Sequence, residues 1–359
     1  MLYQQAENFA VFNKPVYAPG DTVEGIAVLT LMGHMPNSVR LSVEGRDNCE
    51  IRRTDPMKLD RSFMKSDEIQ LQVGRHILKP GTYQVPFSFK IPTGVPDSFK
   101  FDKNHGAAKS QIEYRVCISL HFGEGEDSRI ETSWSAFEVR NRIPSADRIA
   151  KPVVNAPVHH DIYKCCCFKT GAISAELSID KSAYFPGETV KFRAVIKQSK
   201  IGKIRGLKAE FGSVVHASQP HPLSETLIFC EDVDHKEIAT PPITFDPNTL
   251  ETVVEFEVTI PEDADSSSMG IFARRCHFIR VHADTPSTFI TDFGICVLVL
   301  PKSDADLSVT YPQSLMDRVK ERVPVELMAL PKLEWKLPAN IHVESIPRGS
   351  MEEFIVPIL

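Results

Sequence analysis

The sequence reads KPVYAPGDTVEGIAV from Lys14 to Val28 and, 167 positions further on, KSAYFPGETVKFRAV from Lys181 to Val195. The two stretches share eight of fifteen residues, including Tyr-x-Pro-Gly followed by an acidic residue and Thr-Val. In each stretch, proline fixes φ at the first central position of a turn and glycine supplies the positive φ of the second, which predicts a type II turn. Apolar and polar residues alternate on both sides of the second turn. The repeated stretch therefore predicts a β-hairpin with one buried face.

A second pair of matching stretches extends the repeat. VPFSFKIPTGVPDS begins at Val85 and VEFEVTIPEDADSS begins at Val254, with valine, phenylalanine, Ile-Pro and a serine in register. Two blocks at nearly the same offset, 167 and 169 positions, indicate a duplicated domain. Further short alternating segments follow in both halves. We therefore expect an all-β protein with two tandem immunoglobulin-like β-sandwich domains and an extended C-terminal tail.

The repeat also sets the expected domain boundaries. Residues 1–145 should form the first sandwich and residues 164–302 the second. Residues 146–163 between them are rich in proline and alanine and lack alternation, which predicts a linker. Residues 303–359 lie outside the repeat and form the tail, in which residues 314–323 predict a short amphipathic helix that ends before proline.

Composition and charge exclude several classes of protein. A chain of 359 residues suits two domains. The net charge of −6 argues against a general affinity for nucleic acid, so no nucleic-acid partner is expected. The N-terminal MLYQQAENFAVF lacks the basic start and apolar run of a secretory signal, and no apolar segment of the sequence is long enough to span a bilayer. We therefore expect a cytoplasmic protein, and its eight mostly scattered cysteines favour reduced, buried thiols.

Taken together, these stretches resemble the arrestin-domain proteins, and the alpha-arrestins in particular. The resemblance rests on Y-x-P-G-D/E-x-V in each half, on YQVPFSFKIPTGVPDSF (Tyr83 to Phe99) followed by IEYRVCISL, and on CCCFKTGAISAELSIDKSAYFPGE (Cys165 to Glu188). It implies two arrestin-like sandwiches in a non-enzymatic adaptor. Such an adaptor binds cytoplasmic regions of receptors or transporters and recruits sorting, endocytic or ubiquitylation machinery. It is cytoplasmic and is recruited peripherally to the plasma membrane or endosomes.

The sequence departs from that family in two motifs. Alpha-arrestins commonly carry Pro-Pro-x-Tyr ligands for WW domains, but here Pro241-Pro242 is followed by Ile243-Thr244, so contact with a ubiquitin ligase is expected to be indirect. Visual and beta-type arrestins sense receptor phosphates with a lysine pair after a phenylalanine of the first strand. Here Ala10-Val11 follows Phe9, which does not support phosphate sensing by that device.

No motif of the sequence predicts catalysis or a cofactor. It lacks Gly-x-Ser-x-Gly, a phosphate-binding glycine-rich loop and His-Glu-x-x-His. His159-His160 with Cys165-Cys166-Cys167 is the best candidate for metal binding or acylation, but neighbouring residues of a strand face opposite sides and the spacing lacks Cys-x-x-Cys. We interpret the cysteine triplet as packing residues, with palmitoylation and redox pairing as the alternatives.

Three groups of residues are candidates for binding. A basic cluster that would contact anionic lipid, such as phosphoinositides, or an acidic peptide comprises Lys197, Lys200, Lys203, Arg205 and Lys208. An apolar C-terminal cluster that would act as a tail latch by adding a strand to a sheet edge comprises Phe354, Ile355, Val356, Ile358 and Leu359.

The third group is a pair of candidate reactive thiols, Cys230 and Cys276. They belong to an alternative interpretation of the chain as a redox-responsive, thioredoxin-binding regulator. A constitutive coat subunit of the retromer kind, which shares the fold, is the other alternative.

Overall fold

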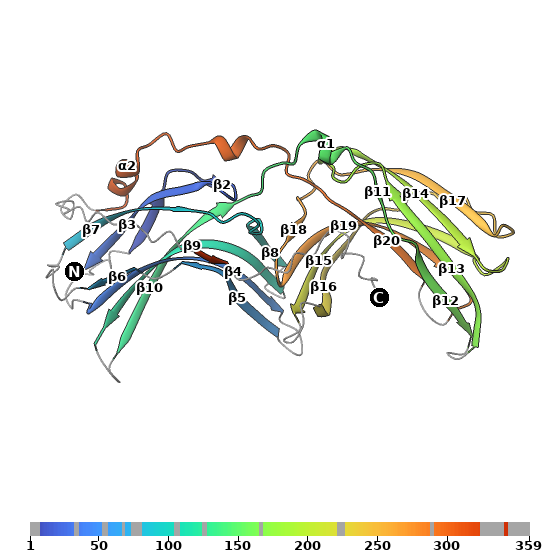
Figure 1. Ribbon diagram of the computed structural model, residues 1–359, viewed down its shortest axis with the longest axis horizontal. Coiled ribbons are helices and arrows are strands. Elements are labelled where there is room, and N and C mark those ends of the chain that lie inside the picture. Colours follow the sequence, from blue (N-terminus) through green and yellow to red (C-terminus); the bar gives the residue numbers. More distant parts are fainter. Residues whose placement is uncertain are drawn as a thin grey trace. The chain divides into compact units, whose positions relative to one another are not determined.

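The computed structural model describes residues 8–31, 36–51, 57–66, 69–72, 81–103, 108–123, 128–164, 168–220, 227–287, 291–323 and 341–343. These residues divide into two units, one of residues 8–142 with 304–343 and one of residues 143–303. Each unit consists of two β-sheets (Figure 1). The predicted all-β fold with two tandem sandwiches is therefore confirmed.

The first unit pairs a three-stranded sheet with an eight-stranded sheet. The small sheet has the order β1-β3-β7, formed by β1 Phe9–Phe12, β3 Thr22–Leu31 and β7 Gly81–Lys90. The large sheet has the order β2-β10-β9-β4-β5-β21, with β6 beside β4 and β8 beside β9. Its strands are β2 Val16–Tyr17, β4 Ser38–Ile51, β5 Met57–Ser66, β6 Ile69–Gln72, β8 Phe99–Lys103, β9 Ala108–Phe122, β10 Arg129–Val139 and β21 Ile341–Val343.

The second unit is built from two five-stranded sheets. One has the order β11-β13-β14-β17 with β12 beside β13, and the other has the order β16-β15-β19-β18 with β20 beside β19. The elements are α1 Ala146–Ile149, β11 Val153–Val154, β12 Val158–Lys164, β13 Phe168–Ile179, β14 Thr189–Gln198, β15 Gly206–Pro220, β16 Leu227–Ala239, β17 Glu251–Thr259, β18 Ser268–Met269, β19 Ala273–Asp284 and β20 Asp292–Val297.

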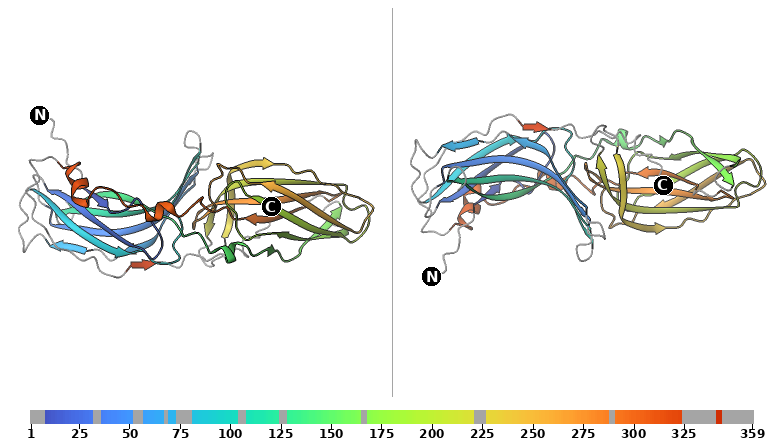
Figure 2. Two further views of the ribbon diagram at one scale, coloured as in Figure 1. Left: turned by 90° about the horizontal axis from the view of Figure 1, so that it is seen from above. Right: turned by 90° about the horizontal axis from the view of Figure 1, so that it is seen from below.

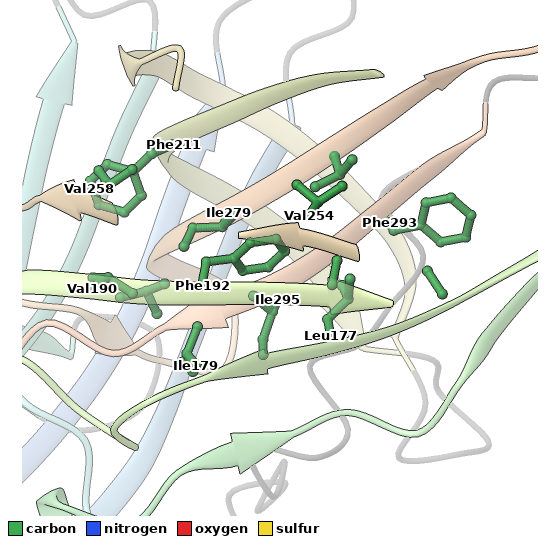
Figure 3. Close-up of a cluster of buried hydrophobic side chains, with 14 of the residues drawn as sticks. Leu177, Ile179, Val190, Phe192, Phe211, Val254, Val258, Ile279, Phe293 and Ile295 are labelled. Carbon is green, nitrogen blue, oxygen red and sulfur yellow. The ribbon is translucent and has the colours of Figure 1, made fainter. Parts of the chain in front are cut away.

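Alternate residues of the second unit's strands form its core. Leu177 and Ile179 of β13, Phe192 of β14 and Ile279 of β19 point into the space between the two sheets (Figure 3). Each is almost completely buried, whereas the neighbouring residues in β13 and β14 are more exposed. The period of two seen in the sequence therefore arises because successive side chains of a strand alternate between core and solvent.

The repeated stretches form the same turn in both units. Gly20 and Gly187 have φ of 89° and 87°, a conformation that favours glycine. Each glycine donates its N–H to the carbonyl oxygen of the isoleucine in the second repeated block, Gly20 to Ile91 (2.9 Å) and Gly187 to Ile260 (3.0 Å). The two blocks are repeated together because they are hydrogen bonded to each other.

The tyrosine of the repeat ties each turn to the strand before it. The hydroxyl of Tyr17 donates to Asn13 Oδ1 (2.6 Å), and that of Tyr184 donates to Asp180 Oδ1 (2.8 Å). Burial raises the pKa of the Tyr17 phenol to about 12, so it stays protonated and keeps donating at physiological pH. These tyrosines have a structural role.

The serine of the second block also acts twice. Ser98 exchanges hydrogen bonds with Val139, donating its N–H to the carbonyl (2.7 Å) and accepting the valine N–H on its hydroxyl (2.9 Å). Ser267 repeats both bonds with Val299, at 2.8 Å and 3.1 Å. Ser98 therefore fixes the end of β10, and Ser267 fixes the segment that follows β20.

Residues 304–323 pack on the first unit, although they follow the second sandwich in the sequence. The 3-10 helix η3 Ala305–Ser308 buries Leu307 against the segment that contains β2. Next to it, the guanidinium of Arg140 pairs with Asp306 at 3.0 Å. This segment is therefore joined to the first unit by an apolar contact and by an ion pair.

Helix α2 Leu315–Lys320 covers the outer face of β1 and β3 (Figure 1). Ser314 caps the helix by accepting the N–H of Asp317 at 3.2 Å. Arg318 donates to the carbonyl oxygen of Phe12 at 2.5 Å. The apolar contact joins Leu315, Met316, Val319 and Val323 to Phe9, Val11, Ile26 and Val28. Val11, one of the two residues found where a lysine pair would sense phosphate, therefore lies under this helix.

Two segments that were expected to lie outside the sandwiches, the linker and the tail, contain strands in the structure. Residues 146–163, expected as a linker, contain α1, β11 and most of β12, and both strands pair with β13. The sequence did not reveal these strands, because β11 has only two residues and the sequence VHHDIYK of β12 does not alternate strictly between apolar and polar residues. In the expected tail, β21 pairs with β5 at the rim of the first unit, where Figure 2 shows it as a red arrow.

Candidate functional site

The predicted basic cluster lies on and beside the loop between β14 and β15. Lys197 is in β14 and Lys208 is in β15, while Lys200, Lys203 and Arg205 belong to the loop itself. The loop turns at a glycine of positive φ. The structure therefore brings these five predicted residues to one end of the second unit.

The buried side chain of Gln198 fixes the conformation of this loop through hydrogen bonds. Its Oε1 accepts the N–H groups of Lys203 (3.0 Å) and Ile204 (3.2 Å). Its Nε2 donates to the carbonyl oxygen of Thr249, and its backbone N–H donates to Leu250 (2.8 Å). One glutamine thus joins the basic loop to the turn before β17. Gln198 could not be recognised from the sequence, because a polar residue at an inward position stands out only when the strand register is known.

The five cations differ in whether a carboxylate lies close enough to neutralise them. Lys197 pairs with Glu251 at 3.3 Å and Lys208 approaches Glu237 at 3.9 Å, across neighbouring strands in both cases. Among the residues that the structure describes, no carboxylate pairs with Lys200, Lys203 or Arg205. The loop therefore carries the uncompensated positive charge, and the two lysines in the strands contribute less.

Two exposed apolar side chains accompany this charge. Ile201, between Lys200 and Gly202, is 58% exposed, and Leu250 on the adjoining turn is 53% exposed. Gln198 donates to the backbone of Leu250, so the loop and this turn lie next to each other. An apolar tip surrounded by lysines can enter the interface of an anionic membrane while its charges contact the headgroups. The sequence signal for this tip was an isoleucine between lysines in a loop.

The two predicted thiols lie in one sheet but apart from each other. Cys230 of β16 pairs with Ser218 of β15, whereas Cys276 of β19 pairs with Val214 of the same strand. A whole strand and four positions along it separate them, which is farther than a disulfide spans. The side chain of Cys230 lies outside the described residues. Two other thiols, those of Cys117 and Cys296, have pKa values raised to about 11 by burial, which makes them poor nucleophiles.

Two other predicted groups fall wholly or partly outside the described residues. The latch residues 354–359 and the triplet Cys165–Cys167 are not described. Of the neighbouring histidines, His160 packs against Phe293 and lies 3.0 Å from the carbonyl oxygen of Asp292, whereas His159 is exposed on the opposite side of β12. The described residues contain no cluster of three or more potential metal ligands. Nor does any helix within the described ranges have the length and apolar character needed to cross a bilayer.

Comparisons with known proteins match both halves of the chain. Residues 8–131 match the model of the N-terminal domain of arrestin (or S-antigen), and residues 169–302 match the model of its C-terminal domain. Arrestin domain-containing protein 17 of Caenorhabditis elegans is 28% identical over 136 residues. That alignment covers 34% of this chain and 28% of the relative. The matched ranges contain both copies of the duplicated turn, the contact between Ser267 and Val299, and the basic loop.

Proposed function

This chain belongs to the arrestin family, and from that premise we propose that it is a non-enzymatic trafficking or signalling adaptor. Family membership supports the adaptor role in general. In this chain the cargo is a cytoplasmic segment of a receptor or transporter, and other surfaces recruit sorting, endocytic or ubiquitylation machinery. The protein works in the cytoplasm and is recruited to the plasma membrane or to endosomes.

The basic loop, residues 199–205, is the contact with the membrane. The observation that carries this part of the proposal is the exposed Ile201 among cations that have no carboxylate partner in the described residues. A basic residue near an anionic membrane contributes about 1 kcal/mol to binding. Three such residues around an apolar tip favour anionic lipid over an acidic peptide, because a peptide would leave Ile201 in water.

Neutralising the loop should weaken membrane binding. We expect the variant K200Q/K203Q to bind vesicles of mixed phosphatidylcholine and phosphoinositide roughly thirtyfold more weakly than the wild type, from about 1 kcal/mol per lysine. The measurement is vesicle co-sedimentation at fixed ionic strength. K151Q/K302Q, which removes the same charge from exposed sites of the same unit, is the control. Equal binding by all three proteins would refute the contact.

We propose that the C-terminal cluster, residues 354–359, acts as a latch that lowers cargo affinity by adding a strand to a sheet edge. Deleting residues 351–359 should increase the membrane cargo recovered by quantitative affinity purification from detergent-solubilised cells. A longer truncation is unsuitable, because removing α2 would expose Phe9, Val11, Ile26 and Val28. Unchanged cargo recovery after the short deletion would show that the cluster is not a latch.

The same purification with the full chain tests the adaptor role against its alternatives. An adaptor recovers membrane proteins together with a ligase or sorting factor. A fixed stoichiometric complex would favour the coat subunit, and recovery dominated by thioredoxin and lost in the variant C276S would favour the redox regulator.

A further inference from the structure

Strand β10 presents to solvent an edge whose outer face, from Ile130 to Trp134, is uncharged and partly apolar. Its residues from Arg129 to Phe137 pair with β9 on one edge. Within the described residues, the strand on its other edge is β2, which pairs only at Glu138 and Val139. The end of β10 near Arg129 is exposed on both faces, and Figure 1 shows β9 and β10 extending together to the lower rim of the unit. The stretch from residue 130 to residue 134 is therefore an accessible sheet edge, whereas Ser135 beyond it accepts the N–H of Ala10 of β1 (2.8 Å).

The backbone groups on this edge belong to the even-numbered residues. The N–H of Arg140 donates to Tyr17 of β2 (2.8 Å), whereas the N–H of Val139 donates to Ser98 on the opposite side (2.9 Å). Residues two apart in a strand direct their hydrogen-bonding groups to the same edge. Ile130, Thr132 and Trp134 thus offer their N–H and C=O groups to a further strand.

The side chains of these same three residues make the edge unusual. Ile130 is 60% exposed and Trp134 is 52% exposed, both on the outer face with Thr132 between them. Free edges are normally protected by charged residues. Strand β17, the terminal strand of a sheet in the second unit, has that protection: its outward Glu251, Glu255 and Glu257 pair with cations of β14.

The row Ile130, Thr132 and Trp134 is complementary to itself. When two copies of β10 lie antiparallel with a two-fold axis at Thr132, each Ile130 faces Trp134 of the other copy and the two threonines face each other. Aromatic with β-branched residues and threonine with threonine are favourable cross-strand pairs. On the inner face, Arg129 and Glu131 would face Ser135 and Ser133, so no like charges are opposed.

We propose that β10 is a homodimerisation edge at which two copies of this chain form one continuous sheet. The N–H and C=O groups of Ile130, Thr132 and Trp134 all point to the shared edge. Each of the three pairs that these residues form is therefore a hydrogen-bonded antiparallel pair. The axis makes the contact isologous and closed, so it yields dimers and not filaments. One short strand from each copy buries less surface than a permanent dimer requires, so the dimer is concentration-dependent.

Cysteine cross-linking tests the register. In the full chain, T132C places one cysteine directly opposite its symmetry mate, whereas S133C, one residue away, places its cysteine opposite Glu131. We expect mild oxidation to give a covalent dimer with T132C, and only the wild-type background with S133C. Equal cross-linking of the two variants, or none with T132C, would overturn the pairing.

Sedimentation velocity tests the surface independently. We expect wild-type protein to associate as its concentration rises, and W134K to associate at least roughly tenfold more weakly, because a charge on each strand opposes pairing. V253K, which adds the same charge to an exposed apolar position of β17, should associate like the wild type. Thermal unfolding of W134K close to that of the wild type shows that the fold is kept. A wild type that stays monomeric throughout, or a W134K dimer, would refute the proposal.

Discussion

Replacing Gly25 by alanine should destabilise the first unit by roughly 3 kcal/mol, the upper end of the usual cost of overpacking a core. A β-carbon at this position of β3 would lie 2.3 Å from the carbonyl oxygen of Val11 and 2.3 Å from Cζ of Phe87. The carbonyl belongs to the backbone of β1, so relief requires β1 to move away from β3. The measurement is urea unfolding followed by circular dichroism.

Gly206 provides the matched control for this substitution. It is also a strand glycine, at the start of β15, but the nearest atom to its added β-carbon is Cβ of Asp284 at an ordinary 3.9 Å. G206A should therefore change the free energy of unfolding by no more than about 0.5 kcal/mol. Similar unfolding curves for the two variants would show that β1 adapts and that our account of Gly25 is wrong.

The duplication explains why Gly25 is a glycine. Its counterpart in the second repeat is Phe192, which stacks on Phe256 of the neighbouring strand with ring centroids 4.7 Å apart. In the first unit, Phe87 is the counterpart of Phe256 and pairs with Gly25. Its ring fills the space that two rings share in the second unit. In the first unit, Phe87 alone therefore fills this part of the core, because Gly25 beside it has no side chain.

This pair of positions also marks how far sequence can predict the fold. The type II turns, the alternation and the duplication follow from local rules, and these three features are sufficient to predict two sandwiches. The exchange of Phe192 for Gly25 was visible in the alignment of the repeats, but its cause was not, because β7 and β1 are distant in sequence. The hydrogen bonds of Ser98 to Val139 were hidden for the same reason.

The tail and the candidate site show the same limit. Leu315, Met316, Val319 and Val323 indicate a helix with one apolar face, yet nothing in their spacing says that the face covers β1 and β3. The basic loop was predicted by charge, but the pairing of Lys197 and Lys208 depends on strand register. Periodicity specifies a face, and only the topology supplies its partner.

Acidification should destabilise the second unit through His277. The residue is only 2% exposed, and its ring lies beside Phe211 and approaches the hydroxyl of Ser267 at 3.4 Å. Burial, and secondarily the positive charge of Arg275, lower its pKa from 6.5 to about 4, while Asp265 acts weakly in the opposite sense. The folded state therefore binds this proton less readily than the unfolded state does.

The sign of the pH dependence follows from that difference. The stabilising effect of a neutral His277 is complete above pH 6.5 and is lost as the pH falls from 6.5 toward 4. Between pH 7 and pH 5, this one group should reduce the free energy of unfolding by about 2 kcal/mol, and by about 3 kcal/mol at pH 4. Urea unfolding at a series of pH values measures the loss.

Two replacements that cannot titrate separate protonation from packing. H277Q and H277F differ in volume and in their ability to bond Ser267, so their stabilities at pH 7 should differ from each other and from the wild type. Both lack the proton, however, and both should lose about 2 kcal/mol less than the wild type between pH 7 and pH 5. If the two variants kept the wild-type pH dependence, other groups would be responsible for acid sensitivity. If the two variants differed from each other in pH dependence, repacking around Phe211 would be changing the titration of neighbouring residues. The loss of stability in acid could then not be assigned to His277.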